Sequence, residues 1–268
     1  MKNNKHKILV LSDLKSSDST MLKNTVSLAK IIDADIDFLC IKKPTEVVKK
    51  ENQLSAMRTI NQEHFSTKKQ IKSLLNPINK AYNTNINYTL RYGNVKNEIA
   101  NYIESYQPDI VVLGKRKSKL LSVMGDNILK HVFKQHSGTI MISGEENVLE
   151  PNNDLTLGLF NDANGSFHFA DNLIKHTQKP LKAFKIVKNP DNVTSTNIDD
   201  KKTIEYVFEE NDNVFKNLSN YLLKNNVNLL CINRKSKKLK KTNKNLKNVI
   251  NNLNVSLFLT TEQNLKYQ

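Results

Sequence analysis

The chain has 268 residues, of which 38% are hydrophobic and 25% charged, and its formal net charge is +15. This apolar content excludes a disordered chain, and the length suits two domains of ordinary size. No run approaches the ~20 apolar residues that cross a bilayer, so we expect neither a membrane span nor a signal peptide. The two cysteines, Cys40 and Cys231, lie in separate apolar runs, which predicts reduced, buried thiols and a cytoplasmic protein.

The positive charge invites a nucleic-acid interpretation. Lys and Asn are abundant along the whole chain, however, and only residues 234–247 form a dense basic segment, which contains no aromatic residue. A nucleic-acid footprint would interleave its basic residues with aromatic or Arg contacts. We therefore expect a solvated basic loop and no nucleic-acid partner, with weak binding of phosphate-rich partners by this segment as the alternative.

In the first part of the chain, short apolar runs alternate with segments of helical periodicity. Strands are predicted at 7–13, 35–41, 86–93, 109–114 and 139–143, and helices at 16–32, 47–82, 95–105 and 125–135. Strands separated by helices of this length imply βαβ crossovers and a parallel sheet covered on both faces.

A polar, Asn-rich run at 145–155, which carries Pro151, is predicted to be a linker. After it the pattern restarts, with strands predicted at 155–162, 181–187, 203–210, 227–233 and 255–260 and helices at 167–177, 214–224 and 243–252. The tetrapeptide RKSK follows the fourth strand of each half, at 116–119 and at 234–237. This repeat indicates an internal duplication. We predict two doubly wound five-stranded parallel-sheet domains in tandem, residues 1–147 and 154–268.

Ligands of open parallel sheets bind outside the carboxyl ends of the strands, where the winding direction reverses. Ser12, Asp13, Ile41 and Gly114 follow the strands at this edge. Asp13 is suited either to accept hydrogen bonds from ribose hydroxyls or to cap the following helix, and the sequence leaves both roles open.

A glycine and basic segment follows the fourth strand. Gly114 stands at the strand exit, Lys115 and Arg116 begin a basic loop, and Gly125, Asp126 and Asn127 stand at the next helix start. Glycines let the backbone approach a phosphate closely, a helix N-terminus offers free N–H groups, and Lys or Arg supplies the opposite charge. These residues are the candidates for phosphate binding.

With Asp13 after its first strand and the blocks RYGNVKNEIANYIESYQPDIVVLGKRK and MGDNILKHVFKQHSGTIMIS, the first half resembles the universal stress protein family. Members that bind ATP carry a loop of the form Gly, two residues, Gly, nine residues, Gly, Ser or Thr. Gly114 and Gly125 match its first and last glycines. The chain departs from the pattern in that Lys117 replaces the middle glycine, Asp126 replaces Ser or Thr, and the spacer is two residues shorter.

The resemblance implies an adenine-nucleotide α-hydrolase-like fold and a stress-response protein that binds ATP, with magnesium, in its first half and signals through protein contacts. It also implies that the two halves form a pseudo-dimer with the fifth strands at their contact, and it leaves open a further homodimer. The second half is the degenerate copy. Ile232 stands in it at the place of Gly114, Asn243 at that of Gly125, and Asn161 and Asp162 near that of Ser12 and Asp13, so we expect no nucleotide there.

Other chemistry finds little support in the sequence. None of the six histidines forms a metal-ligand pattern, and neither a P-loop nor a serine-hydrolase elbow occurs. We therefore expect no catalytic residues. Two alternatives stay open. One is a scaffold that has lost nucleotide binding, and the other is a slow ATP hydrolase in which Asp126 holds the metal.

Overall fold

The computed structural model describes residues 5–14, 18–43, 53–115, 126–151, 153–161, 169–178, 180–187, 203–234 and 243–260. The first half contains β1 (His6–Ser12), α1 (Asp18–Ile32), β2 (Ala34–Lys42), α3 (Gln53–Tyr82), β3 (Ile86–Tyr92), α4 (Val95–Tyr106), β4 (Ile110–Gly114), α5 (Asp126–Gln135) and β5 (Thr139–Ser143). The second contains β6 (Leu157–Phe160), α6 (Ala170–Lys175), β7 (Leu181–Val187), β8 (Thr203–Glu209), α7 (Val214–Lys224), β9 (Leu229–Asn233), α9 (Asn243–Asn252) and β10 (Ser256–Thr260).

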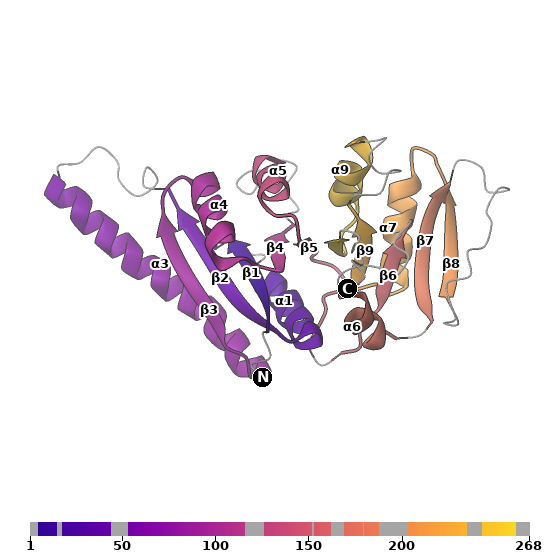
Figure 1. Ribbon diagram of the computed structural model, residues 1–268, viewed down its shortest axis with the longest axis horizontal. Helices are drawn as coiled ribbons and strands as arrows, with labels where there is room; N and C mark the ends of the chain where they lie inside the picture. Colours follow the sequence, from indigo (N-terminus) through magenta and orange to yellow (C-terminus); the bar gives the residue numbers. More distant parts are fainter. Residues whose placement is uncertain are drawn as a thin grey trace, which may run out of the picture.

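All ten strands belong to one sheet, in the order β3-β2-β1-β4-β5-β10-β9-β6-β7-β8 (Figure 1). Every pairing is parallel except that of β5 with β10, which is antiparallel and centred on Met141 and Phe258. Each half is thus a doubly wound five-stranded sheet, and the fifth strands form the contact between halves. The doubly wound sheets predicted from the sequence and the contact of the fifth strands that the resemblance implies are both confirmed.

Helices cover both faces of the sheet. One buried cluster joins α1, α3 and α6 to the sheet, and a second cluster on the other face includes residues of α4, α5, α7 and α9. Strands that are buried on both faces carry near-continuous apolar runs, and the central ones here do. Because both clusters contain residues from each half, the hydrophobic core runs through the contact at β5 and β10.

The segment predicted as a linker is packed between the halves. Leu149 is 2% exposed, and its carbonyl oxygen accepts a hydrogen bond from Ser27 Oγ at 2.7 Å. Glu150 accepts hydrogen bonds from Lys23 Nζ at 3.0 Å and from Tyr82 Oη at 2.7 Å. The sequence did not predict that this connection is fixed to α1 and α3. The domain limits at residues 147 and 154 stay a prediction.

The described helices include none that is both long and apolar enough to span a bilayer. The longest, α3, has 30 residues, and its exposed positions include Phe65 at 72%. In Figure 1 it runs along the β3 end of the sheet and extends beyond it.

Candidate functional site

The winding direction of the first half reverses between β1 and β4, which are adjacent in the sheet. Ser12 lies opposite Cys40 in the register of β1 with β2, and Leu11 lies opposite Leu113 in β4. The structure therefore brings the predicted strand-end residues Ser12, Asp13, Ile41 and Gly114 to one edge of the sheet. This is the edge at which open α/β sheets bind their ligands.

Ser12 shapes the turn after β1. Its hydroxyl donates a hydrogen bond to the Asp18 carboxylate in the first turn of α1 and accepts one from Leu14 N at 2.9 Å. Ser12 and Asp18 are each 3% exposed, so both polar groups are satisfied inside the protein. Leu14 has a φ of 61°, a left-handed conformation that costs a side-chain-bearing residue energy.

Asp13 therefore stands in a strained turn that is held by a buried hydroxyl and carboxylate. The sequence analysis identified Ser12 and Asp13 but missed Asp18. An acidic residue in the first turn of a helix is a signal that could have found it. Nothing in the sequence indicates a left-handed leucine.

Lys115 follows β4, and its side chain reaches into the second half. Its Nζ donates to the carbonyl oxygens of Asn251, at 3.2 Å, and Leu253, and to Asn254 Oδ1 at 3.3 Å. These acceptors lie at the C-terminal end of α9, where a cation is favoured by the helix dipole. Burial lowers the pKa of Lys115 to about 8. The predicted phosphate contact of Lys115 stays a prediction, and its ammonium group is bound to the other half.

Arg234 is the counterpart of Lys115 in the second half. The guanidinium of Arg234 donates through Nη2 to the carbonyl oxygen of His136, just after α5, at 2.9 Å, and Cζ lies 5.9 Å from the centre of the Phe133 ring. Burial lowers the pKa of Arg234 from its ordinary value. Each half thus sends one basic side chain to the end of the other half's last helix.

This symmetry corrects the internal alignment made from the sequence. Gly114 pairs with the last residue of β5, and Asn233 pairs with the last residue of β10. Asn233, and not Ile232, therefore occupies the place of Gly114, and Arg234 corresponds to Lys115 rather than to Arg116. The repeated RKSK misplaced the match by one residue, because neighbouring basic residues fit either register.

The same comparison supports other parts of the alignment. Asn161 stands at the place of Ser12, as predicted, since both directly follow the positions that pair with β9 and β4. In place of a contact to the next helix, Asn161 Oδ1 accepts a hydrogen bond from Ile186 N at 3.1 Å. Asp162 lies outside the described residues.

The phosphate-loop candidates are described only in part. Arg116, Lys117 and Gly125 lie outside the described residues, and Asp126 and Asn127 form the first turn of α5. Asn127 is exposed. Among the residues that the structure describes, no group of three metal-ligating side chains could hold an ion.

Beneath this edge a buried polar contact joins α1, β5 and the connection between halves. Asn24, which is fully buried, donates to Ser143 Oγ at 2.9 Å and to Gly144 O at 3.3 Å, and accepts from Leu149 N at 2.7 Å. Gly144 leaves no room for a side chain, since a Cβ there would lie 2.2 Å from the Asn254 carbonyl oxygen. The sequence analysis singled out neither residue.

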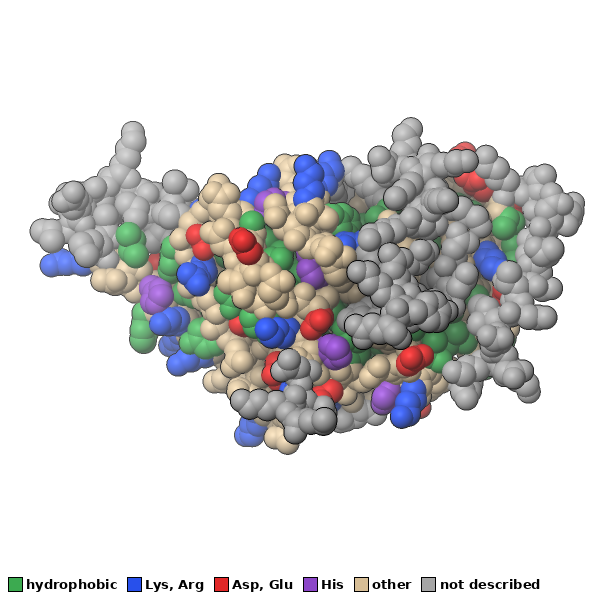
Figure 2. All heavy atoms as spheres, viewed as in Figure 1, with side chains coloured by type: hydrophobic (Ala, Val, Ile, Leu, Met, Phe, Trp, Pro, Cys, Tyr) green, Lys and Arg blue, Asp and Glu red, His purple; other side chains and the backbone are tan. Residues whose placement is uncertain are grey.

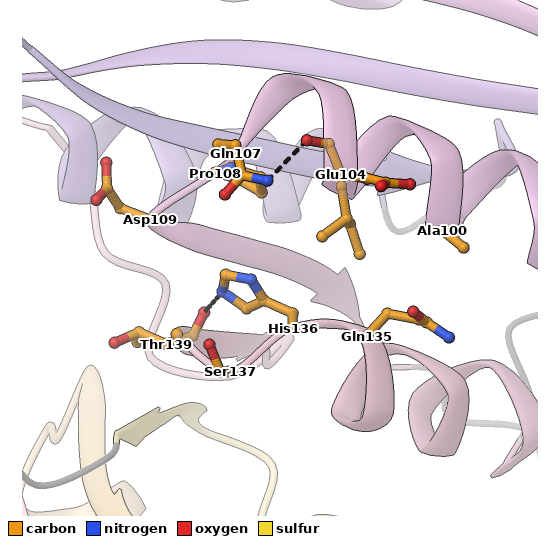
Figure 3. A pocket seen from close by; sticks show the side chains of 11 residues that line it. Ala100, Glu104, Gln107, Pro108, Asp109, Gln135, His136, Ser137 and Thr139 are labelled. Carbon is orange, nitrogen blue, oxygen red and sulfur yellow. Dashed lines mark hydrogen bonds between the residues drawn. The ribbon is translucent and has the colours of Figure 1, made fainter.

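A cavity of about 620 Å³ lies at the opposite edge of the sheet (Figure 3). It opens between the last turns of α4 and α5 and contains none of the predicted site residues. Its lining residues are Ala100, Ile103, Glu104, Gln107, Pro108, Asp109, Gln135, His136, Ser137, Gly138 and Thr139. Because the strands end at the other edge, this cavity is separate from the candidate nucleotide site.

On the face that Figure 2 shows, Lys and Arg side chains lie in several separate places, including over α3, α4 and α5.

Comparison with known proteins finds a family match in the first half. The model of the family described as "Universal stress protein family" matches residues 5–135. Two solved structures share the fold of both halves. A universal stress protein from Archaeoglobus fulgidus DSM 4304 has a TM-score of 0.68 and 12% identity, covering 97% of this chain and 100% of its own. A functionally unknown protein from Pseudomonas aeruginosa PAO1 has a TM-score of 0.55 and 9% identity, covering 97% and 93%. No curated protein matches significantly.

Proposed function

Residues 5–135 belong to the universal stress protein family, and from that premise we propose that this chain is a cytoplasmic stress-response protein that binds an adenine nucleotide in its first half. ATP with magnesium is the form that we propose. The observation that carries the proposal is the edge at which β1, β2 and β4 end, with Asp13 in a strained turn between β1 and α1.

The described residues fit the nucleoside part of such a ligand. Asp13 supplies a carboxylate for ribose hydroxyls, and Ile41, at the end of β2, supplies an apolar contact for the base. Gly114 at the end of β4 leaves space for a close approach of backbone to ligand. The phosphates would meet the loop from Arg116 to Gly125 and the first turn of α5, where Asn127 offers an exposed amide.

We infer that the second half does not bind nucleotide. Asn233 places a side chain where Gly114 has none, and Asn161 Oδ1 is already bonded to the backbone of β7. Its role is to complete the pseudo-dimer, to which it contributes β10, α9 and the guanidinium of Arg234. The protein then acts through binding and through contacts with a protein partner rather than through catalysis.

One observation favours the scaffold without nucleotide as a second candidate. The Lys115 ammonium donates to acceptors at the end of α9. A cation held there is not free to neutralise a phosphate, so nucleotide binding would depend on other groups or on release of this contact.

Equilibrium binding of ATP to the full chain, measured by calorimetry with and without magnesium, tests the proposal. We expect saturable binding that Asp13→Ala weakens by about tenfold or more, as the loss of charge-assisted hydrogen bonds to ribose would. Asp212→Ala removes an exposed carboxylate from the second half and should bind ATP as the unmodified chain does. Absence of binding in all three proteins would contradict the proposal and favour a scaffold that does not bind nucleotide.

A further inference from the structure

Among the described residues, the large apolar side chains that are exposed gather at two places. Ile60 and Phe65 lie on α3, with exposed fractions of 38% and 72%. Ile204 and Val207 lie on β8 at 42% and 39%, and Tyr221 of α7, at 41%, packs its ring against β8. Figure 1 shows α3 and β8 at opposite ends of the molecule, which we call the α3 end and the β8 end. Apolar residues that gather in this way are typical of contact surfaces.

The α3 end is basic. Four exposed side chains lie within about 60° of Phe65 around the helix axis, namely Arg58, Lys68, Lys69 and Lys72. Among the described residues none of these four cations has a hydrogen-bonding or ionic partner. Glu63 is the only acidic residue in the sequence of α3, and it lies on the opposite side of the helix, where it accepts a hydrogen bond from Thr67 Oγ1 at 3.4 Å.

The β8 end is acidic. Glu209, Glu210 and Asp212, at the end of β8 and in the turn after it, are exposed and have no partner among the described residues. The two lysines of β7 do not offset this charge, because both donate to oxygen atoms of the second half. Lys216, in the first turn of α7, is the nearest exposed basic residue along the described chain. The turn is therefore negative in a chain whose net charge is +15.

The shape of α3 suits a contact beyond its own sheet. Its 30 residues span about 45 Å, whereas the seven residues of β3, on which it packs, span about 23 Å. The buried residues in its described part run from Thr67 to Ile78, so Phe65 precedes the part that packs on the sheet. At the other end, β8 is the last strand of the sheet. Proteins commonly cover such an edge strand with a helix.

We propose that the two ends bind each other between copies of this chain, with α3 of one copy lying across the outer edge of β8 in the next. Phe65 packs against Ile204 and Val207, and the basic residues around it face the carboxylates of Glu209 and Glu210. The two surfaces differ and lie at opposite ends, so each contact leaves one of each free. The contact is therefore heterologous and repeats to form open chains of copies.

Sedimentation velocity on the full chain without nucleotide, at concentrations up to the millimolar range, measures this association. The net charge of +15 repels copies in general, so a sedimentation coefficient that rises with concentration would report a specific contact. Phe65→Ser removes the apolar centre of the contact and should weaken association by about tenfold or more. Because Phe65 is exposed, this change should leave the fold intact, which circular dichroism checks.

Charge reversal tests whether unlike ends meet. Lys68→Glu with Lys69→Glu makes the α3 end acidic, and Glu209→Lys with Glu210→Lys makes the β8 end basic. Each variant then has two ends of like charge, so neither should associate alone. A mixture of the two variants should associate as the unmodified chain does, because it again contains ends of opposite charge.

The matched control is Lys130→Glu with Lys134→Glu, which reverses two exposed charges of α5 and should leave association unchanged. The proposal is overturned if the unmodified chain stays monomeric at millimolar concentration, or if the control abolishes association. It is also overturned if the mixture of reversed variants stays monomeric. Association of either reversed variant alone would overturn it as well, because like ends would then be in contact.

Discussion

The two halves share a sheet topology but differ on the face that α3 covers. In the first half this long helix packs on β3, whose side chains toward it are Ile86, Tyr88 and Leu90. The register gives their counterparts in β8 as Thr203, Glu205 and Val207. Residues 188–202, which connect β7 to β8, are too few for a helix as long as α3 and lie outside the described residues.

The polar residues of β8 meet a matching change in β7. Lys185 takes the place of Cys40, and its Nζ lies 2.7 Å from Glu205 Oε1. Where one half buries a thiol and an aromatic ring beneath α3, the other forms an ion pair on the sheet. The sequence of a strand face thus follows what covers it, even when the backbone topology is the same.

The opposite face shows the reverse exchange. In the first half Tyr102 of α4 donates to Asp37 Oδ2 at 2.6 Å and lies 3.0 Å from Thr89 Oγ1. In the second half Tyr221 of α7 contacts the rings of Tyr206 and Phe208. A polar network has been replaced by aromatic packing, so each half keeps one apolar and one partly polar contact at its outer strands.

The two halves meet at the contact of β5 with β10, and Gly144→Ala is the change that should destabilise this contact most. The new Cβ would meet the backbone of Asn254 and Val255, which cannot move away as a side chain can. We expect a loss of about 3 kcal/mol in the free energy of unfolding, measured with urea. Gly93→Ala is the matched control, since its Cβ meets only the side chain of Glu98. Equal losses would show that the close approach at Gly144 is unimportant.

Asn24→Ala should be the next most harmful change. It removes three buried hydrogen bonds and leaves Leu149 N without its acceptor, which should cost about 2 kcal/mol in the free energy of unfolding. Asn61→Ala, on the exposed side of α3, should change it by less than about 0.5 kcal/mol. Urea unfolding compares the two, and a harmless Asn24→Ala would mean that water replaces the lost bonds.

Lys115 and Arg234, the two basic side chains that cross the contact, allow the same test to be made in each half. Lys115→Met and Arg234→Met should each lower the free energy of unfolding by about 1 to 2 kcal/mol, because each leaves helix-end carbonyl groups without a donor. Thermal and urea unfolding of both variants measure this effect. If only one variant is destabilised, the two contacts are symmetric in geometry but not in energy.

The smallest effect is expected at the ion pair of the second half. Glu205→Gln leaves Lys185 without its carboxylate partner and should lower the free energy of unfolding by about 1 kcal/mol or less, with a smaller difference at high salt. Glu209→Gln changes an exposed carboxylate of the same strand and is the control. If both changes have the same effect, the pair does not stabilise the sheet.

Much of this fold could be predicted because central parallel strands are apolar on both faces and are separated by helical periodicity. Elements such as β5, β7, α7 and α9 have the predicted bounds. The pairing of β5 with β10 followed from the family resemblance rather than from the residues, since any buried strand looks the same. The packing of Asn24 and Gly144 against the second half gives no local signal at all.

The candidate site was predictable only where it depends on position along a strand. Ser12, Asp13, Ile41 and Gly114 reach one edge because parallel strands end together. The direction of the Lys115 side chain depends on α9, which is distant in sequence, so no local pattern contains it. The cavity at Glu104 was missed because its walls come from the ends of two helices and two strands.

The central claim is that a duplicated fold keeps a nucleotide site in one half only. The number of ATP molecules bound per chain at saturation, measured by equilibrium dialysis with labelled ATP and magnesium, tests this claim most directly. We predict one ATP per chain, bound about tenfold or more weakly by Asp13→Ala and with unchanged affinity by Asn161→Ala. Two ATP molecules per chain would contradict the difference between the halves, and none would contradict the nucleotide site itself.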